Sequence, residues 1–298
     1  MSDFRLKVFR SVANNLSFTK ASQELFISQP AITKHIQELE TCYKARLFDR
    51  QGNKISLTEA GKLLLEHSER ILDAYKRLEY DMHLLHDDYI GELKLGASTT
   101  ISQYVLPPLL GSFIRKFPQV TLSLLNGNSR GVEVASQEHR VDLGLVEGIY
   151  RLPNLKYTTF LEDELVAVVH TRNKLSLPEE IEPKDLAGIP LVLRERGSGT
   201  LDVIERALQQ HNIKLSSLNV MMYLGSTESI KLFLENTDCM GIVSIRSISK
   251  ELASGTFRVI EIKGMQMMRE FCFVHQQGQE GGLSQVFMQF AMHHSKKL

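Results

Sequence analysis

The segment from Glu59 to Asp88 constrains the fold of this chain more than any other feature, because it contains no Pro and only one Gly, Gly61. Four apolar residues repeat along it every seven positions, namely Leu64, Ile71, Leu78 and Leu85. Seven residues make almost two α-helical turns, so these side chains form one apolar seam on a long helix. Such a seam usually packs against a partner helix. We therefore expect a linker helix over residues 59–89 that separates two domains and brings two copies of the chain together.

Positive charge is concentrated before this helix. The whole chain has 35 basic and 35 acidic residues, but residues 1–58 hold nine basic against five acidic residues. A partner with many negative charges is therefore expected to bind this segment and not the protein as a whole. With 298 residues, 43% of them hydrophobic, the chain is long enough to build two domains with separate cores, which excludes a disordered chain.

The cysteines and the N-terminal residues indicate the compartment. Cys42, Cys239 and Cys272 are far apart and form no CxxC pair, which is typical of a reducing cytosol, and we expect three buried free thiols. The first fifteen residues carry charges throughout, and no stretch approaches the roughly 18 uninterrupted apolar residues of a membrane span. We expect a soluble, cytoplasmic protein that has no membrane partner.

Residues 1–58 have the pattern of three short helices and a β-hairpin. Apolar residues from Leu6 to Ala13 line a first helix, and a second helix follows from about Phe18 to Leu25. After the tight turn Phe26-Ile27, Ser28 is positioned to cap a third helix. Pro30 is tolerated in the first turn of that helix, since its backbone nitrogen would have no partner there. The segments 46–50 and 54–58 then flank the turn Gln51-Gly52-Asn53 as two strands. Together these elements predict a winged helix-turn-helix over residues 1–58.

The third helix has one apolar and one polar face. Ile32, Ile36 and Leu39 are spaced to face inward. The residues left to face outward are the candidate DNA contacts Ser28, Gln29, Pro30, Thr33, Lys34 and Gln37. In the hairpin, Arg50 and Lys54 would lie at the height of the DNA phosphates. A polar helix face on its own is more often just solvated, but the preceding helices and the basic hairpin favour DNA binding.

From Glu92 onward the chain alternates short apolar runs with helical patterns, which is typical of an α/β domain. The strand candidates include Leu165–His170 and Phe271–Val274, and the helix candidates include Leu109–Phe117. Residues 89–92 contain Gly91 and are expected to form the hinge between the linker helix and this domain. No internal repeat is present.

Two segments of the second half place hydroxyl groups between a strand and a helix. They contribute the candidate ligand-binding residues Ser98, Thr99, Thr100 and Gln103 from one segment and Ser198, Gly199 and Thr200 from the other. Glu147 follows another strand, and Ser226 opens a further helix. Backbone N–H groups and hydroxyls in such positions bind anions. Neither segment has the spacing of a Walker motif or of a GxSxG elbow, and ordinary helix caps are the alternative.

The sequence FRSVANNLSFTKASQELFISQPAITKHIQELE, followed by LFDRQGNKISLTEAG, resembles the N-terminal half of LysR-type transcriptional regulators. Length, linker helix and α/β second half extend the resemblance over the whole chain. One departure is Thr33-Lys34, where many members of the family carry Ser-Arg, and Lys binds a phosphate as a point charge where Arg can pair with guanine. The segment STTISQYVLP resembles the branch of the family concerned with sulfur or carbon assimilation.

The resemblance implies an α/β fold with a winged N-terminal domain, a dimerising linker helix and an effector-binding domain over residues 92–298. That domain would consist of two α/β subdomains resembling a periplasmic binding protein. The first would span about 92–161 and 265–298, and the second about 162–264. By the same resemblance the two hydroxyl-rich segments face the cleft between the subdomains.

The expected partners are double-stranded promoter DNA, a small anionic effector and further copies of the chain, in a homodimer or homotetramer. We expect no cofactor, because the histidines at 83 and 86 have no Cys or carboxylate cluster to complete a metal site. Asp163-Glu164 is expected to be charged surface, and no catalytic constellation is evident. The alternatives are a ligand-binding protein without a DNA function, or an enzyme of small-acid metabolism fused to a helix-turn-helix.

Overall fold

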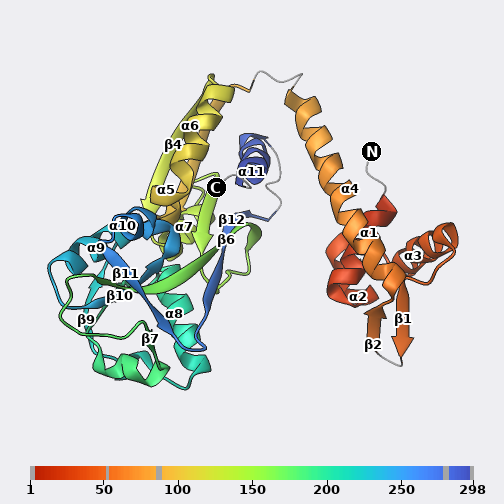
Figure 1. Cartoon of the computed structure of the whole chain (residues 1–298). Helices are drawn as coiled ribbons and strands as arrows, with labels where there is room; N and C mark the ends of the chain where they lie inside the picture. The colour runs from red at the N-terminus through yellow and green to blue at the C-terminus, as the bar shows by residue number, and fades with distance from the viewer. Residues whose placement is uncertain (1–3, 52–53, 85–88, 278–281, 296–298) are drawn as a thin grey trace. The chain divides into compact units, whose positions relative to one another are not determined.

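The computed structural model describes residues 4–51, 54–84, 89–277 and 282–295 (Figure 1). The chain divides into two compact units, Met1–Asp87 and Asp88–Leu298.

The first unit contains four helices and a two-stranded hairpin (Figure 1). In chain order these are α1 (Phe4–Asn15), α2 (Phe18–Leu25), α3 (Gln29–Tyr43), β1 (Phe48–Gln51), β2 (Lys54–Leu57) and α4 (Glu59–Leu84). The antiparallel register pairs Arg50 with Ile55 and Gln51 with Lys54. Gln51 therefore belongs to the strand and not to the turn, and β1 begins at Phe48 instead of Arg46. The turn residues Gly52 and Asn53 lie outside the described residues.

The core of this unit is formed where α1, α2, α3 and the hairpin meet the beginning of α4. Phe9, Ile32 and Leu72 are fully buried in it. Gly61 permits the close packing of α4, because a Cβ atom at this position would lie 2.2 Å from the carbonyl oxygen of Leu47. The first turn of α4 thus belongs to the winged unit, which explains why a glycine stands in an otherwise uninterrupted helix.

The predicted seam on α4 is divided between two environments. Leu64 packs against the core of its own unit, whereas Ile71 is 41% and Leu78 is 53% exposed. Leu85 lies outside the described residues. The part of the seam that remains available for a second helix therefore begins after Leu64.

The second unit is built on a twisted mixed sheet with helices on its faces. Its strands are β3 (Gly91–Ser98), β4 (Val120–Gly127), β5 (Leu143–Glu147), β6 (Leu155–His170), β7 (Glu180–Ile181), β8 (Leu191–Arg194), β9 (Val220–Leu224), β10 (Met240–Ser244), β11 (Phe257–Ile262) and β12 (Met267–Gln276). Its helices are α5 (Thr99–Tyr104), α6 (Leu106–Lys116), α7 (Ser129–Gln137), α8 (Gly199–Gln210), α9 (Thr227–Glu235), α10 (Ser249–Ala253) and α11 (Gly282–Ser295), with short 3-10 turns at Pro183–Gly188, Leu215–Ser217 and Ile245–Ile248.

The order of the strands across the sheet is β4-β3-β5-β12-β6-β10-β8-β9, with β11 also paired to β6. The antiparallel pair β6 and β12 is common to both halves of the sheet, because β12 also pairs with β5 and β6 also pairs with β10. The expected subdomain boundaries at residues 161 and 265 fall within β6 and just before β12. We call the part with β3, β4 and β5 the first half and the part with β8, β9 and β10 the second half.

Both shared strands are longer than the sequence patterns indicate. The predictions were Leu165–His170 and Phe271–Val274, whereas β6 starts ten residues earlier, at Leu155, and β12 extends from Met267 to Gln276. The additional residues include charged and polar side chains, which an apolar run does not mark.

Glu92 lies in β3 and not in a hinge. In α6, Pro107 and Pro108 occupy the first turn, where proline is tolerated, so the helix starts before the predicted Leu109.

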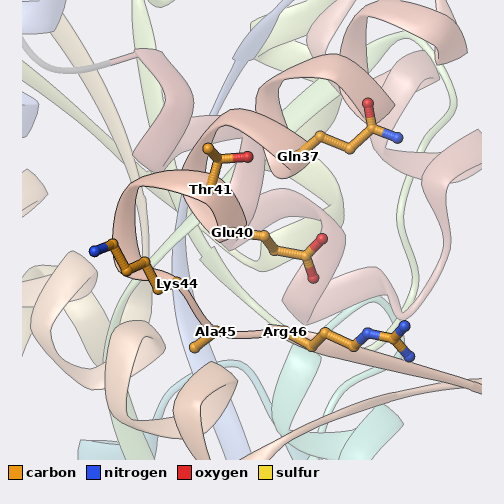
Figure 2. A pocket seen from close by; sticks show the side chains of 6 residues that line it. All are labelled: Gln37, Glu40, Thr41, Lys44, Ala45 and Arg46. Atoms are coloured by element: carbon orange, nitrogen blue, oxygen red, sulfur yellow. The ribbon is translucent and has the colours of Figure 1, made fainter.

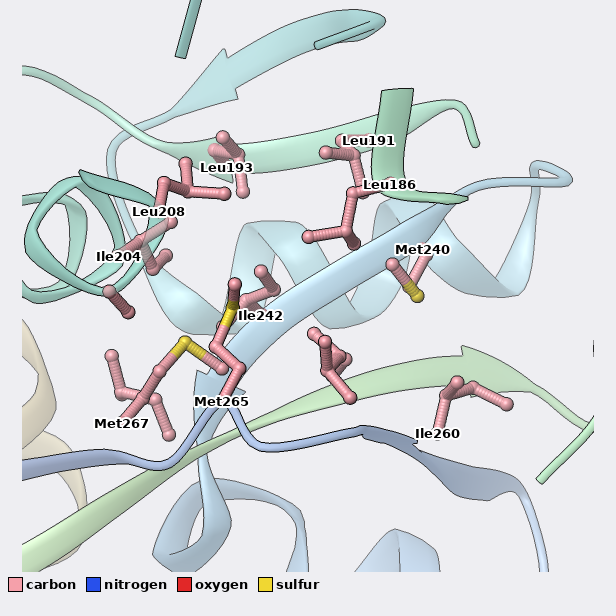
Figure 3. Close-up of a cluster of buried hydrophobic side chains, with 14 of the residues drawn as sticks. Leu186, Leu191, Leu193, Ile204, Leu208, Met240, Ile242, Ile260, Met265 and Met267 are labelled. Carbon is pink, nitrogen blue, oxygen red and sulfur yellow. The ribbon is translucent and has the colours of Figure 1, made fainter. Parts of the chain in front are cut away.

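A large apolar cluster fills the second half of the sheet (Figure 3). Figure 3 shows side chains from β8, α8, β10 and β12 meeting, among them Leu193, Ile204, Ile242 and Met267. The helix α8 is thereby fixed against the sheet with its first turn at the end of β5. In the first half, Phe113 of α6 packs against Phe287 and Phe290 of α11.

Two further predictions can be compared with the structure. Cys239 and Cys272 are buried free thiols as expected, but Cys42 is exposed, because it lies on the outer side of the last turn of α3. None of the helices in the described part of the chain is both long and apolar enough to cross a membrane.

Candidate functional site

The helix α3 presents the polar face that its sequence predicts. The Ser28 hydroxyl caps the helix by accepting a hydrogen bond from the Ala31 amide at 3.4 Å. Ile32, Ile36 and Leu39 are buried in the core of the first unit. The predicted contact residues Ser28, Gln29, Pro30, Lys34 and Gln37 are exposed. Thr33 is half-buried, and its hydroxyl donates to the carbonyl oxygen of Gln29 at 3.1 Å.

A hollow of about 500 Å³ lies at the C-terminal end of α3 (Figure 2). It is lined by Gln37, Glu40, Thr41, Lys44, Ala45 and Arg46. The Glu40 carboxylate accepts a hydrogen bond from the Leu47 amide at 2.8 Å, which fixes the start of the hairpin to α3. Exposed Lys44 and Arg46 add positive charge beside Gln37. The backbone of Arg50 and Lys54 lies in the hairpin, but their side chains are outside what the structure describes.

In the first half of the second unit, the residues predicted from the first hydroxyl-rich segment lie where β3 meets α5. The Ser98 hydroxyl accepts a hydrogen bond from the Ile101 amide at 3.4 Å and donates one to the Glu147 carboxylate. The hydroxyls of Thr99 and Thr100 are buried and have no hydrogen-bond partner. Gln103 is exposed, whereas Ser98, Thr99 and Thr100 are buried. Two hydroxyls are therefore available for a ligand, while Ser98 and Glu147 already bind each other.

The second hydroxyl-rich segment is brought against the same strand end. A Cβ atom on Gly199 would lie 2.0 Å from the carbonyl oxygen of Glu147, so only glycine permits this contact. The Ser198 hydroxyl caps α8 by accepting a hydrogen bond from the Thr200 amide at 3.2 Å. The backbone also joins the two halves here, because the Arg130 amide donates to the carbonyl oxygen of Gly197 at 3.1 Å. The structure thus brings Ser98, Glu147, Ser198, Gly199 and Thr200 together.

A buried arginine that the sequence analysis missed connects these residues. Arg269 of β12 donates from Nη1 to the Thr200 hydroxyl at 2.9 Å and from Nε to Asp163 of β6 at 2.7 Å. Its Nη1 also lies 3.6 Å from the Glu147 carboxylate. Asp163 is buried and accepts a further hydrogen bond from the Ser244 hydroxyl at 2.7 Å. The prediction that Asp163 is charged surface is therefore wrong, although its neighbour Glu164 is exposed.

A second missed arginine, Arg194, ends β8 and is only 1% exposed. Its Nε and Nη2 atoms donate to the Glu195 carboxylate at 2.8 Å and 3.1 Å. Its third nitrogen, Nη1, is buried and has no hydrogen-bond partner. A buried guanidinium with free N–H groups is a strong binding group for an anion.

Tyr104 and Glu228 form a contact between the two halves. The Tyr104 hydroxyl of α5 donates a hydrogen bond to the Glu228 carboxylate of α9. Glu228 also binds Lys231, which lies 2.6 Å from Glu251. Burial and the bond to Glu228 raise the pKa of Tyr104, and the nearby positive charge of Arg194 acts against that rise. Tyr104 lies in α5, the helix that begins with Thr99 and Thr100.

Two other residues lie at the margin of this group. Ser226 caps α9, where its hydroxyl accepts a hydrogen bond from the Ser229 amide at 3.1 Å, and it is half-buried. Asp202 in the first turn of α8 is half-buried, and its pKa is raised to about 6, first by burial and then by the negative charges of Glu205, Glu133 and Glu147. No group of three or more His, Cys, Asp or Glu side chains suited to a metal ion occurs among the residues that the structure describes.

Comparison with known proteins extends the resemblance found in the sequence. Residues 4–62 match the family of bacterial regulatory helix-turn-helix proteins, lysR family, and residues 86–296 match the LysR substrate binding domain. A probable RuBisCO transcriptional regulator of Thalassiosira pseudonana is 32% identical over 277 residues, which cover 91% of this chain and 90% of that protein.

Two solved structures have the same fold. CrgA, a LysR-type transcriptional regulator from Neisseria meningitidis, superposes with a TM-score of 0.73 at 20% identity and covers 99% of both chains. The regulatory domain of Synechocystis CcmR in complex with 2-PG superposes with a TM-score of 0.63 at 26% identity, over 70% of this chain and 99% of that one. With its helix-turn-helix unit and its mixed-sheet unit both matched, this chain belongs to the LysR family of DNA-binding transcriptional regulators.

Proposed function

We propose that this regulator binds promoter DNA as a homo-oligomer and responds to a small anion held among the buried polar residues of its second unit. The observation that carries the anion proposal is Arg194 Nη1, a charged donor that is buried without a partner. Leaving such a donor unsatisfied costs free energy, because the group has lost its hydration and gained no hydrogen bond. An anion would supply the missing acceptor.

Thr99 and Thr100 complete the proposed anion site. Their hydroxyls are likewise buried and unpartnered, and they follow Ser98, whose hydrogen bond to Glu147 joins this strand end to the residue that contacts Gly199, five positions after Arg194. These three side chains provide one charged and two neutral donors to an oxyanion. Glu195 already neutralises part of the charge of Arg194, which favours an anion of low charge over a polyphosphate.

The other predicted effector residues have supporting roles in this proposal. Ser98, Glu147 and Thr200 are engaged with one another or with Arg269, and Ser198 and Gly199 shape the first turn of α8. We place Gln103 and Ser226 at the edge of the site. The regulatory domain of CcmR, which was solved with 2-PG, supports a small ligand in this domain.

For DNA, the proposal assigns base readout to the exposed face of α3. Gln29 and Lys34 lie in the first two turns of the helix, where a recognition helix reaches base edges in the major groove. Ser28, Pro30, Thr33 and Gln37 complete that face, and Arg50 and Lys54 of the hairpin are assigned to phosphates. Basic side chains on both α3 and the hairpin favour a DNA duplex as the partner over the alternative that the polar face of α3 is only solvated.

The homo-oligomer proposal rests on the exposed seam of α4. Ile71 and Leu78 lie two helical turns apart and are both exposed on a helix whose first part is covered by its own unit. Pairing with the same helix of a second copy would remove these side chains from water. A two-fold dimer also presents two recognition helices to a DNA site with matching symmetry.

We infer that the protein acts in the cytoplasm, together with the DNA that it binds, and that it is not an enzyme. The matched relatives are regulators, and the buried arginines and hydroxyls form a binding site without an assigned nucleophile and base. An enzyme fused to a helix-turn-helix is the alternative, and turnover of the bound anion would reveal it.

The anion site can be tested by calorimetric titration of the full chain with sulfate, phosphate and glycolate. Arg194→Lys keeps a positive charge beside Glu195 but replaces the guanidinium and so removes the unpartnered Nη1 donor, which should weaken binding of the preferred anion about tenfold or more. Arg196→Lys is the matched control, because Arg196 is exposed two residues further along the same loop. Equal losses in the two variants, or no binding of any of the three anions, would contradict the proposed site.

A further inference from the structure

Phe26 is the most exposed large hydrophobic side chain of the described residues, with 94% of its surface accessible. It lies in the turn between α2 and α3, two residues before the Ser28 cap of the recognition helix. Its neighbours Leu25 and Ile27 both pack against the core of the first unit. The ring therefore points away from a core that the adjacent side chains reach.

The backbone of Phe26 adds a second cost at the same position. Its φ of 54° lies in the left-handed region, where glycine or asparagine is favoured over a bulky side chain. The turn itself is held by backbone groups, since the amides of Phe26 and Ile27 both donate to the carbonyl oxygen of Ser22. The phenyl ring thus contributes nothing to the fold that a glycine would not supply.

The surroundings of Phe26 indicate what the ring contacts. The next residues along the chain with exposed side chains are Ser28, Gln29 and Pro30. They begin the face of α3 that the proposed function assigns to DNA. In the major groove the one apolar feature of a base edge is the C5 methyl group of thymine. We propose that Phe26 packs against a thymine methyl group beside the bases read by α3, and so determines part of the sequence specificity.

This inference rests on sequence-specific DNA binding by the first unit, and a change to the DNA itself tests it. The full-length wild-type protein first selects duplexes from a random-sequence library. The selected duplex is then prepared in two forms, one with thymine and one in which deoxyuridine replaces thymidine. The two forms differ only in the methyl group. Wild type should bind the deoxyuridine duplex about fourfold more weakly, as expected when one methyl group loses its apolar contact. Phe26→Gly should bind both duplexes with the same reduced affinity.

Leu16→Gly is the matched control variant. Leu16 is also an exposed apolar residue in a turn of the same unit, with φ of 45° and 47% exposure. Both substitutions relieve a left-handed backbone, so neither should lower the midpoint of thermal unfolding, and Leu16→Gly should keep the full difference between the two duplexes. Because no charge is removed, the salt dependence of DNA binding should stay the same in Phe26→Gly.

The proposal is overturned if Phe26→Gly binds the thymine duplex as tightly as wild type, or if it still distinguishes thymine from deoxyuridine to the same degree. Wild type that does not distinguish the two duplexes would also overturn it. If the wild-type protein enriched no sequence from the library, the proposed DNA specificity would fail, which is a separate result.

Discussion

Two threonines of the second unit should respond in opposite ways to the same substitution. Thr200 is buried, and its hydroxyl accepts a hydrogen bond from Arg269 Nη1 at 2.9 Å. Valine has nearly the same shape but no acceptor, so Thr200→Val leaves the Nη1 atom of Arg269 with only the Glu147 carboxylate, at 3.6 Å. A hydrogen bond to a charged group contributes about 1.5–3 kcal/mol. For a unit of this size that loss corresponds to a midpoint of thermal unfolding lower by about 3–12 °C.

Thr100 is equally buried, but its hydroxyl has no partner. Thr100→Val therefore removes a desolvated polar group without breaking a bond, and the free energy of unfolding should stay the same or rise by about 1 kcal/mol. Scanning calorimetry of the full chain measures the midpoint of thermal unfolding of both variants. A spectroscopic probe assigns the transition that belongs to the second unit. The anion response should weaken in Thr100→Val. If Thr100→Val destabilised the unit as much as Thr200→Val does, the Thr100 hydroxyl would have to be hydrogen-bonded, and its proposed role as an anion donor would be wrong.

Three further outcomes are expected. Combining Ile71→Asp with Leu78→Asp should convert the oligomer to monomers in light scattering, because it places charges on the exposed seam of α4; a persistent dimer would contradict the seam. Gln29→Ala should reduce discrimination between specific and random DNA by about 1–3 kcal/mol, whereas Arg50→Ala, at a residue assigned to a phosphate, should weaken binding to both and flatten the salt dependence. The Asp202 carboxylate destabilises the fold above pH 6, where it is charged, and this penalty disappears as the pH falls from about 6 toward the ordinary value of 3.8. Asp202→Asn should therefore raise stability at pH 7.5 and not at pH 4, which urea unfolding at the two pH values measures.

The recognition helix could be predicted from sequence because its determinants are local. Ser28, Pro30 and the spacing of Ile32 and Ile36 fix the cap, the first turn and the buried face within nine residues, and the structure has all of them. The hydroxyl-rich segments were found for the same reason. Each lies directly between a strand and a helix in the sequence.

The charged partners of those segments could not be found in this way. Asp163 and Arg269 are 106 positions apart and meet only because β6 and β12 pair along most of their length. Strand alternation buries Asp163 and exposes Glu164, but the apolar pattern that would have shown the strand starts only at Leu165. Arg194 directly follows the apolar run of β8, and since a charged residue in that position is ordinarily exposed, its burial could not be read from the sequence.

The position of the unpartnered donors also limits how an anion can act. To change a two-state population from 1:99 to 99:1, a ligand must bind one state about 10⁴-fold more tightly, which corresponds to about 5.5 kcal/mol. Arg194 belongs to the second half of the sheet, whereas Thr99 and Thr100 belong to the first. An anion that contacts Arg194 alone binds equally well whatever the placement of the halves and changes nothing. Only an anion that reaches both the guanidinium and the hydroxyls favours one placement, so the size of the anion, more than its charge, should decide which anions regulate DNA binding.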